Sequence, residues 1–467
     1  MRSAYATVFV VLAVATEARA NSLRLVDVLE SVRSTHPLLA AADAAIDRVD
    51  AQALAAEGAF DPQVSVQGST IATGPYQRAT LDTELRMPTS MFGLTPFVGW
   101  RLGQGSFADY DEKLQTPGGG ELRAGVSMPL LQGMKIDRPR AERSKAAIAR
   151  RVADAEVAQR LLDVMRDATF AYWDWVAAGH RLDVRRTQLA LALERGRQID
   201  RAVARGSRPP IEAVDNARLI AAREALVVNA ERDQRRASLE LSLHLRTEHG
   251  HPAPPDASQR PELPVEPLDL PLEADLEAAV GRGLQAAPRL VELAARRDIA
   301  GVDIALARNQ TLPRLDVSAL ATRGLGGTED PALDSTAGLA VGVAATFQVP
   351  IGVRNARGAL AIARADQRRI AADQQFAADR VAVEIRTAHA ELAAAKARSR
   401  LAQRNAELAE QLAAAERTRF ERGDSTVVLV NIREEAAADA AAQAVDARAD
   451  VMRARARFAT LLGEQPR

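Results

Sequence analysis

Two stretches of the chain alternate strictly between apolar residues and small or polar ones. In residues 339–349 and 121–131 every second position is apolar: Leu339, Val341, Val343, Ala345, Phe347 and Val349 in one, and Leu122, Ala124, Val126, Met128 and Leu130 in the other. A period of two predicts β-strands with one apolar face, and about 9 to 11 residues suffice to cross an outer membrane. A soluble sheet with one face in water shows the same pattern, so both interpretations stay open at this point.

Two more alternating stretches follow prolines that end helical runs. After Pro62 the apolar positions are Val64 and Val66, and the same spacing follows Pro313. Proline has no backbone N–H and cannot continue a helix, so Pro62 and Pro313 are predicted to be helix-to-strand junctions. The sequence therefore predicts two strands in each half, which makes four β-strands per chain.

Two long segments have the composition of uninterrupted helices. Residues 141–205 and 359–422 contain no proline, and at 1.5 Å per residue each would form a helix of about 95 Å. Such a helix needs partners along its side. Gly206 and Gly423 follow the two segments, and glycine accepts the left-handed conformation that ends a helix. Each half is therefore predicted to contain a long antiparallel helical hairpin.

The segment that returns from the first of these turns carries a coiled-coil pattern. Its apolar residues are Leu219, Leu226, Ala230, Ala237 and Leu241, at intervals of 7, 4, 7 and 4 residues. This spacing predicts a seam that packs along the preceding long helix.

The predicted elements occur twice in the same order. Residues 21–248 and 272–467 each give a short helix, a strand, a loop, a strand, a long helix, a glycine turn and a helix. This order indicates a twofold internal duplication. Residues 249–271 between the halves are rich in proline and predict a linker or an irregular equatorial collar segment. Residues 79–105 also alternate but have no counterpart in the second half, and either a hairpin that extends a barrel or a plug fits them.

Composition narrows the classes of function. The 61 basic and 61 acidic residues balance, which gives no indication of a nucleic-acid partner. The chain has no cysteine, so disulfides and thiolate metal sites are excluded. Residues 1–20 combine Arg2, an apolar stretch and a small-x-small motif that ends at Ala20. This arrangement predicts a cleaved signal peptide rather than a membrane anchor.

No constellation of residues indicates catalysis or a cofactor. Glu248, His249 and His251 are neighbours in sequence, but a further spaced ligand for a metal is missing. Tyr172, Trp173 and Trp175 lie in the middle of a predicted helix, where packing explains them. The chain is therefore predicted not to be an enzyme and to hold no metal.

Four strands are too few to close a membrane barrel, since the smallest such barrels have eight. The predicted strands and hairpins therefore require several identical copies that share one sheet and one set of helices.

Three segments resemble the TolC-type outer-membrane efflux proteins: MPLLQGMKIDRPRAERSKAAIAR (128–150), AYWDWVAAGHRL (171–182) and ARGSRPPIEAVDNARLIAAREAL (204–226). The resemblance covers essentially all of the mature chain, including the duplication. It implies a mainly α fold with membrane β: a homotrimer with a helical tunnel and a shared 12-stranded barrel in the outer membrane, and a long periplasmic extension.

The resemblance also implies a function and partners. It describes a passive exit duct of a tripartite efflux or type I secretion system, which docks a periplasmic adaptor protein and an inner-membrane transporter and contacts outer-membrane lipid. The alternative is a periplasmic coiled-coil adaptor or scaffold without a pore. That class predicts one hairpin flanked by soluble β-domains, whereas two hairpins alternate with two strand pairs here.

In the resembled family the periplasmic end closes near the helical turns, often with acidic residues in the second hairpin. The corresponding positions here, six and nine residues after Gly423, are Leu429 and Ile432. The first hairpin instead has Glu212 and Asp215 at six and nine residues after its turn glycine. These acids are candidates for a gate, or else helix N-terminal acids favoured by the helix dipole.

Other charged residues surround the two turns and are either candidates for bonds that hold the tip shut or solvated side chains. With the turn glycines, they are Arg205, Gly206, Arg208, Arg422, Gly423 and Asp424.

Overall fold

The computed structural model describes residues 22–108, 115–264, 273–326 and 338–465. The chain divides into two compact units, and each takes segments from both halves of the sequence. The helical unit comprises the residues up to Ala40, Arg160–Ala286 and the residues from Val381. The sheet unit comprises Ala41–Gln159 and Ala287–Arg380. The predicted signal peptide of residues 1–20 lies outside the described residues.

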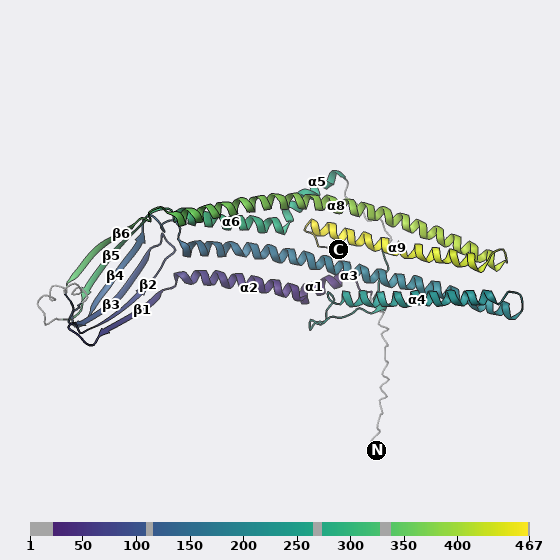
Figure 1. The fold of residues 1–467 in the computed structure, drawn as a ribbon, viewed down its shortest axis with the longest axis horizontal. Coiled ribbons are helices and arrows are strands. Elements are labelled where there is room, and N and C mark those ends of the chain that lie inside the picture. The colour runs from purple at the N-terminus through teal and green to yellow at the C-terminus, as the bar shows by residue number, and fades with distance from the viewer. Residues whose placement is uncertain (1–21, 109–114, 265–272, 327–337, 466–467) are drawn as a thin grey trace, which may run out of the picture. The chain divides into compact units, whose positions relative to one another are not determined.

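The described part of the sheet unit contains one antiparallel sheet of six strands in sequence order (Figure 1). The strands are β1 (Gln63–Ile71), β2 (Arg78–Arg86), β3 (Thr95–Gly105), β4 (Glu121–Pro129), β5 (Arg314–Gly324) and β6 (Leu339–Gln348). The four predicted strands correspond to β1, β4, β5 and β6.

The prediction of four strands per chain is wrong, because residues 79–105 supply two more. These residues form most of β2 and all of β3, which lie between β1 and β4 in the same sheet. Their apolar positions continue those of the neighbouring strands: Leu85 lies opposite Val64 on one side and Val98 on the other. A shared period of two allows the extra hairpin to join the sheet with its apolar residues on the common face.

The two helices that lead into the sheet are each followed by a proline. In the first half α2 (Pro37–Glu57) and the 3₁₀ turn η1 (Gly58–Phe60) precede Pro62 and β1. In the second half α6 (Pro288–Asn309) precedes Pro313 and β5. The long helices α3 (Arg138–Ala204) and α8 (Arg354–Glu421) begin in this unit. Ion pairs link α3 to both short helices, from Arg150 to Asp50 at 2.7 Å and from Lys145 to Asp303 at 3.1 Å.

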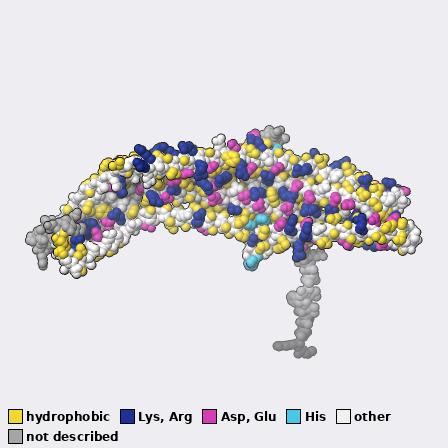
Figure 2. All heavy atoms as spheres, viewed as in Figure 1, with side chains coloured by type: hydrophobic (Ala, Val, Ile, Leu, Met, Phe, Trp, Pro, Cys, Tyr) yellow, Lys and Arg dark blue, Asp and Glu magenta, His cyan; other side chains and the backbone are white. Residues whose placement is uncertain are grey.

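The helical unit contains the remaining parts of α3 and α8 with α1 (Leu25–Thr35), α4 (Ile211–Leu241), α5 (Glu273–Ala286) and α9 (Val427–Leu461). The two predicted long helices are confirmed, with 67 residues in α3 and 68 in α8. Gly206 and Gly423 have φ angles of +71° and +85° at the turns into α4 and α9, the region that glycine enters without strain. Figure 2 shows basic and acidic side chains interspersed along the helices.

None of the described helices has the length and apolar character needed to cross a membrane.

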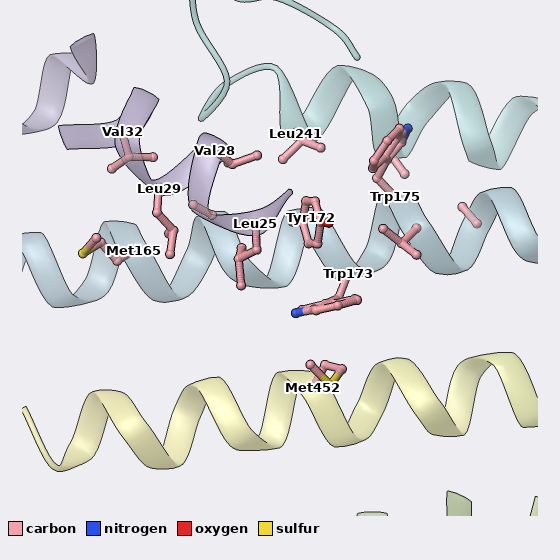
Figure 3. Packing of buried hydrophobic residues seen from close by; sticks show 14 of the residues in the cluster. Leu25, Val28, Leu29, Val32, Met165, Tyr172, Trp173, Trp175, Leu241 and Met452 are labelled. Carbon is pink, nitrogen blue, oxygen red and sulfur yellow. The ribbon is translucent and has the colours of Figure 1, made fainter. Parts of the chain in front are cut away.

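The main core of the helical unit surrounds the aromatic residues of α3. Trp175 is completely buried, and the hydroxyl of Tyr172 donates a hydrogen bond to the carbonyl oxygen of Leu23 at 2.8 Å. Figure 3 shows Trp173 directed toward Met452 on α9, whereas Tyr172 and Trp175 lie on the side of α1 and α4. The prediction that these aromatic residues serve packing is confirmed.

The predicted seam on α4 is correct only toward the end of the helix. Ala237 and Leu241 are buried, but Leu226 is exposed. The buried positions nearer the turn are polar, namely Asn216 and Arg223. They lie 7 residues apart and continue at the same interval through Ala230 to Ala237, so a sequence interpretation restricted to apolar residues missed the true seam.

The proline-rich segment after α4 is irregular where it is described. It contains the 3₁₀ turn η3 (Ala257–Gln259), whose preceding Asp256 accepts a hydrogen bond from the Ser258 backbone N–H at 2.8 Å. Arg260 forms an ion pair with Asp183 on α3. The segment is therefore tied to the long helix by its side chains.

Candidate functional site

The two faces of the sheet differ in chemistry. One face carries Leu81, Leu85, Val98, Trp100, Leu102, Leu122, Val126, Val317, Val341, Val343 and Phe347. On β6 these side chains are strongly exposed, with Val343 at 75%. The opposite face of the six strands carries mainly polar, charged or small residues. An apolar outer face and a polar inner face are what a membrane channel requires.

The polar face carries a band of charges on β2, β3 and β4. Arg101 pairs with Glu121 at 2.6 Å, and Arg123 pairs with Asp82 and lies 4.0 Å from Glu84. Both arginines are at most one-fifth exposed. Sequence reasoning noted the alternation of this segment but missed the band, because its partners become neighbours only when β3 lies between β2 and β4.

The outermost strands of the sheet present open edges. Every residue of β1 and every residue of β6 is exposed. A long, flat edge strand with unpaired backbone groups is a template for pairing with another strand. The described sheet is therefore incomplete as an isolated unit.

The turn of the first hairpin contacts the second hairpin through Arg208. Its guanidinium lies over the Phe420 ring of α8, 4.3 Å from the ring centroid, and also pairs with Glu212 at 2.7 Å. Asp215 lies 3.7 Å from Arg218 on the same helix. Both predicted gate acids thus lie in the first two turns of α4 and face arginines of their own hairpin.

The second turn is held mainly by its own residues. The backbone N–H of Asp424 donates to the Arg419 carbonyl oxygen at 2.9 Å, and the Ser425 hydroxyl donates to Glu416. In the described part of the chain, Arg205, Arg422 and the Asp424 carboxylate form no ion pair. Of the predicted tip residues, the structure thus brings Arg208 into contact with the other hairpin.

Farther along the hairpins from the turns, one buried carboxylate of α9 binds arginines of α3 and α4. Glu434 of α9 is 3% exposed and accepts two hydrogen bonds from Arg195 of α3, at 2.6 and 2.9 Å. It accepts a third from Arg223 of α4 at 3.1 Å. Arg417 of α8 lies 3.8 Å away. We call Arg195, Arg223, Arg417 and Glu434 the buried charge cluster.

The electrostatics of the buried charge cluster follow from this geometry. Burial acts to raise the pKa of Glu434, but the hydrogen bonds and charges of Arg195 and Arg223 outweigh it and hold the pKa below its usual range. Burial lowers the pKa of Arg223 despite the attraction of Glu434. A single carboxylate is therefore shared by two buried guanidinium groups, and Arg195 Nε and two nitrogens of Arg223 are buried without a hydrogen-bond partner among the described residues.

The sequence contains a signal for this cluster that was overlooked. Arg223 occupies a position in the heptad spacing of α4, 7 residues after Asn216 and 7 before Ala230. A charged residue at a seam position costs stability unless a partner is present, so it indicates a specific buried contact. The partner itself is 211 residues away in sequence and no local pattern identifies it.

Comparisons with known proteins agree with this arrangement. Residues 280–464 match the outer membrane efflux protein family. No curated protein matches the sequence.

Solved outer-membrane channels share the fold. CmeC of Campylobacter jejuni is 13% identical over 95% of this chain and 87% of that chain, with a TM-score of 0.67. VceC of Vibrio cholerae is 16% identical over 95% and 97%, with a TM-score of 0.66. MtrE of Neisseria gonorrhoeae, solved in its open state, is 16% identical over 97% and 94%, with a TM-score of 0.66.

The resemblance to TolC-type outer-membrane efflux proteins is thus confirmed. The match of residues 280–464 to this family indicates a location in the outer membrane and the role of an efflux channel, which is a passive conduit and not an enzyme. The solved structures show that the fold, which is mostly helical with an antiparallel sheet, is that of outer-membrane channels.

Proposed function

We propose that this outer-membrane efflux protein is the passive exit duct of a tripartite efflux or type I secretion system. It works as a homotrimer whose copies share one barrel, and it docks a periplasmic adaptor protein and an inner-membrane transporter that supplies the energy. The observation that carries the proposal is the single sheet with an apolar face, a polar face and two open edges.

The topology of the sheet suits closure by identical copies. Neighbouring strands are antiparallel throughout, and the number of strands in the described sheet is even, so β1 and β6 run in opposite directions. The β6 edge of one copy can therefore pair in antiparallel fashion with the β1 edge of the next. Closure removes every edge, which a sheet in lipid requires because no water is present to satisfy unpaired backbone groups.

The two helical hairpins supply the closable part of the duct. Arg208 contacts the second hairpin through Phe420 and pairs with Glu212 of its own hairpin, and the buried charge cluster connects α3, α4 and α9 farther from the turns. We assign to Arg208 and Glu212 the role of holding the tip closed. Glu212 and Asp215 of three copies would then form anionic rings near the pore axis, which favour cations.

The turns of the hairpins are also where the adaptor is proposed to dock.

The scaffold alternative is disfavoured because it predicts one hairpin between soluble β-domains. The described residues instead contain two hairpins, α3 with α4 and α8 with α9, and one sheet built from both halves of the chain.

Electrical recording in planar lipid bilayers tests the proposed function. Detergent-extracted protein is expected to pass ionic current at both polarities without nucleotide, and the Arg208→Ala variant is expected to pass more. The variant matters because a closed tip alone can suppress current in the wild type. An absence of current from both proteins, with purified protein that stays soluble without detergent, would support the scaffold and overturn the channel.

A further inference from the structure

We propose that the β2–β3 hairpin is a segment of the channel wall, so that three copies close a barrel of 18 strands rather than 12. The inference rests on the proposed function, since it concerns the width and lining of that same duct. Six strands from each of three copies give the 18. The starting observation is that β2 and β3 lie between β1 and β4 rather than outside the sheet.

The hairpin is inserted without disturbing the rest of the sheet. All nine residues of β1 pair with β2, and β3 pairs with β4 over Thr95–Arg101. Because a hairpin adds two antiparallel strands, β1 and β4 have the same relative direction with or without it. A sheet without the hairpin would consist of β1, β4, β5 and β6. It would have the same two edge strands, β1 and β6, and these would run in the same directions as they do now.

The outer face of the hairpin continues the apolar face of the sheet. Leu81 lies opposite Leu102, and Trp100 lies opposite Leu122 of β4. Leu81 and Leu122 are 38% and 44% exposed, so a substantial part of each side chain is left open by the described residues. In an outer-membrane protein the occupant of this face is the acyl chains of the lipid, because a plug in the lumen would place these side chains in water.

The hairpin is closely packed, both between its own two strands and against β4. Gly99 lies between Glu84 and Arg123, and a methyl group there would come within 2.7 Å of the Thr83 carbonyl oxygen. The Phe97 ring covers Gly125 of β4, which compensates a glycine in a strand interior. By contrast, nothing lies within 4 Å of the corresponding position at Gly342 on β6.

The charge band of Asp82, Glu84, Arg101, Glu121 and Arg123 then lines the wall of the pore. Its ion pairs join β2 to β4 and β3 to β4 across the inner face. Since barrel diameter grows roughly linearly with strand number, 18 strands give about 1.5 times the diameter of 12. The wider exit admits bulkier cargo, and the cargo passes a band of paired charges rather than a field of one sign.

Electron cryomicroscopy of the full chain in lipid nanodiscs tests the strand count directly. The wild type is expected to show 18 strands. A variant that lacks residues 78–105 joins β1 to β4 by the remaining loop and is expected to show 12, with a barrel about 1.5 times narrower.

Tryptophan fluorescence provides a second readout that needs no deletion. Lipids brominated on their acyl chains should quench the Trp100 contribution in the wild type, and Trp100→Phe should lose that quenching, because Trp173 and Trp175 are buried in the helical unit. The matched control combines Trp100→Phe with Phe97→Trp. It places the indole on the inner face of the same strand and should resist these lipids.

The outcomes separate the two proposals. A wild-type protein that forms no trimer and ignores lipid overturns the proposed function itself. A trimer that conducts but shows 12 strands, with Trp100 unaffected by brominated lipid, overturns the 18-stranded wall and leaves the duct standing.

Discussion

At the scale of single residues, Glu434 of the helical unit is the buried acid on which two buried arginines depend. It is the carboxylate that Arg195 and Arg223 share, and both arginines are nearly inaccessible, at 6% and 2% exposure. Desolvation makes a buried ion pair a poor source of net stability, but removal of one partner leaves uncompensated charge. The structure is therefore far more sensitive to loss of Glu434 than to loss of an exposed acid.

This sensitivity gives a first prediction. Glu434→Gln should lower the free energy of unfolding of the helical unit by about 3–5 kcal/mol, measured by chemical denaturation followed by circular dichroism. Glu435→Gln, an exposed neighbour on the same helix, should change it by less than about 0.5 kcal/mol. Equal effects of the two substitutions would show that the buried charge cluster does not hold the helices together.

A second residue-scale prediction concerns pH. His36 stacks on His244 with ring centroids 5.4 Å apart. Burial, together with the neighbouring His244 and Arg246, lowers the pKa of His36 from 6.5 to about 4. The folded state thus resists protonation that the unfolded state accepts below pH 6.5. Stability is complete above that pH and falls as the pH drops toward 4, by on the order of 2–3 kcal/mol.

The measurement is the thermal unfolding midpoint of wild type and His36→Gln between pH 7.5 and pH 4. The variant should lose part of the acid sensitivity, because glutamine does not titrate. Glu434 contributes separately and at lower pH, since its lowered pKa places the loss below its ordinary value of 4.5. Identical pH profiles for wild type and variant would contradict the assignment to His36.

At the scale of elements, the proposed gate at the helical turns gives a third prediction. Arg208→Ala removes both the contact with Phe420 and the ion pair with Glu212 and should raise the mean conductance in bilayers several-fold. The double variant Glu212→Ala with Asp215→Ala tests the anionic rings and should reduce cation selectivity. Unchanged conductance and selectivity in the double variant would leave these acids as helix N-terminal residues only.

The elements also show how far sequence reasoning reaches. Proline and glycine positions predicted the junctions at Pro62 and Pro313 and the turns at Gly206 and Gly423, because these residues restrict the backbone locally. Alternation predicted the strands. It did not predict that residues 79–105 insert between β1 and β4, because a period of two gives a strand its faces but not its neighbours.

The site was harder to predict than the fold for a related reason. Glu434 and Arg195 are 239 residues apart, and Glu434 lies in a helix with many exposed acids. The contact of Arg208 with Phe420 likewise joins two hairpins that no local pattern relates. Burial of a charge depends on the packing of several helices, so composition and spacing indicate the candidates without their partners.

At the scale of the whole molecule, the sheet cannot be complete in one copy. The edges formed by β1 and β6 are exposed along their full length, and the apolar face is open. Both features are costly for a soluble monomer, through aggregation at the edges and hydration of apolar surface. Identical neighbours and lipid remove both costs at once, and this is the central claim of the proposed function.

Covalent trapping of the β1–β6 seam in the outer membrane tests that claim most directly. The chain has no cysteine, so Ser65→Cys on β1 can be combined in turn with Ala340→Cys, Gly342→Cys or Ala344→Cys on β6 without background. At least one pair should oxidise to a species that migrates as a covalent trimer in denaturing gels, and neither single variant should do so. Monomers alone from every pair, in membranes that contain folded protein, would contradict a sheet shared by three copies.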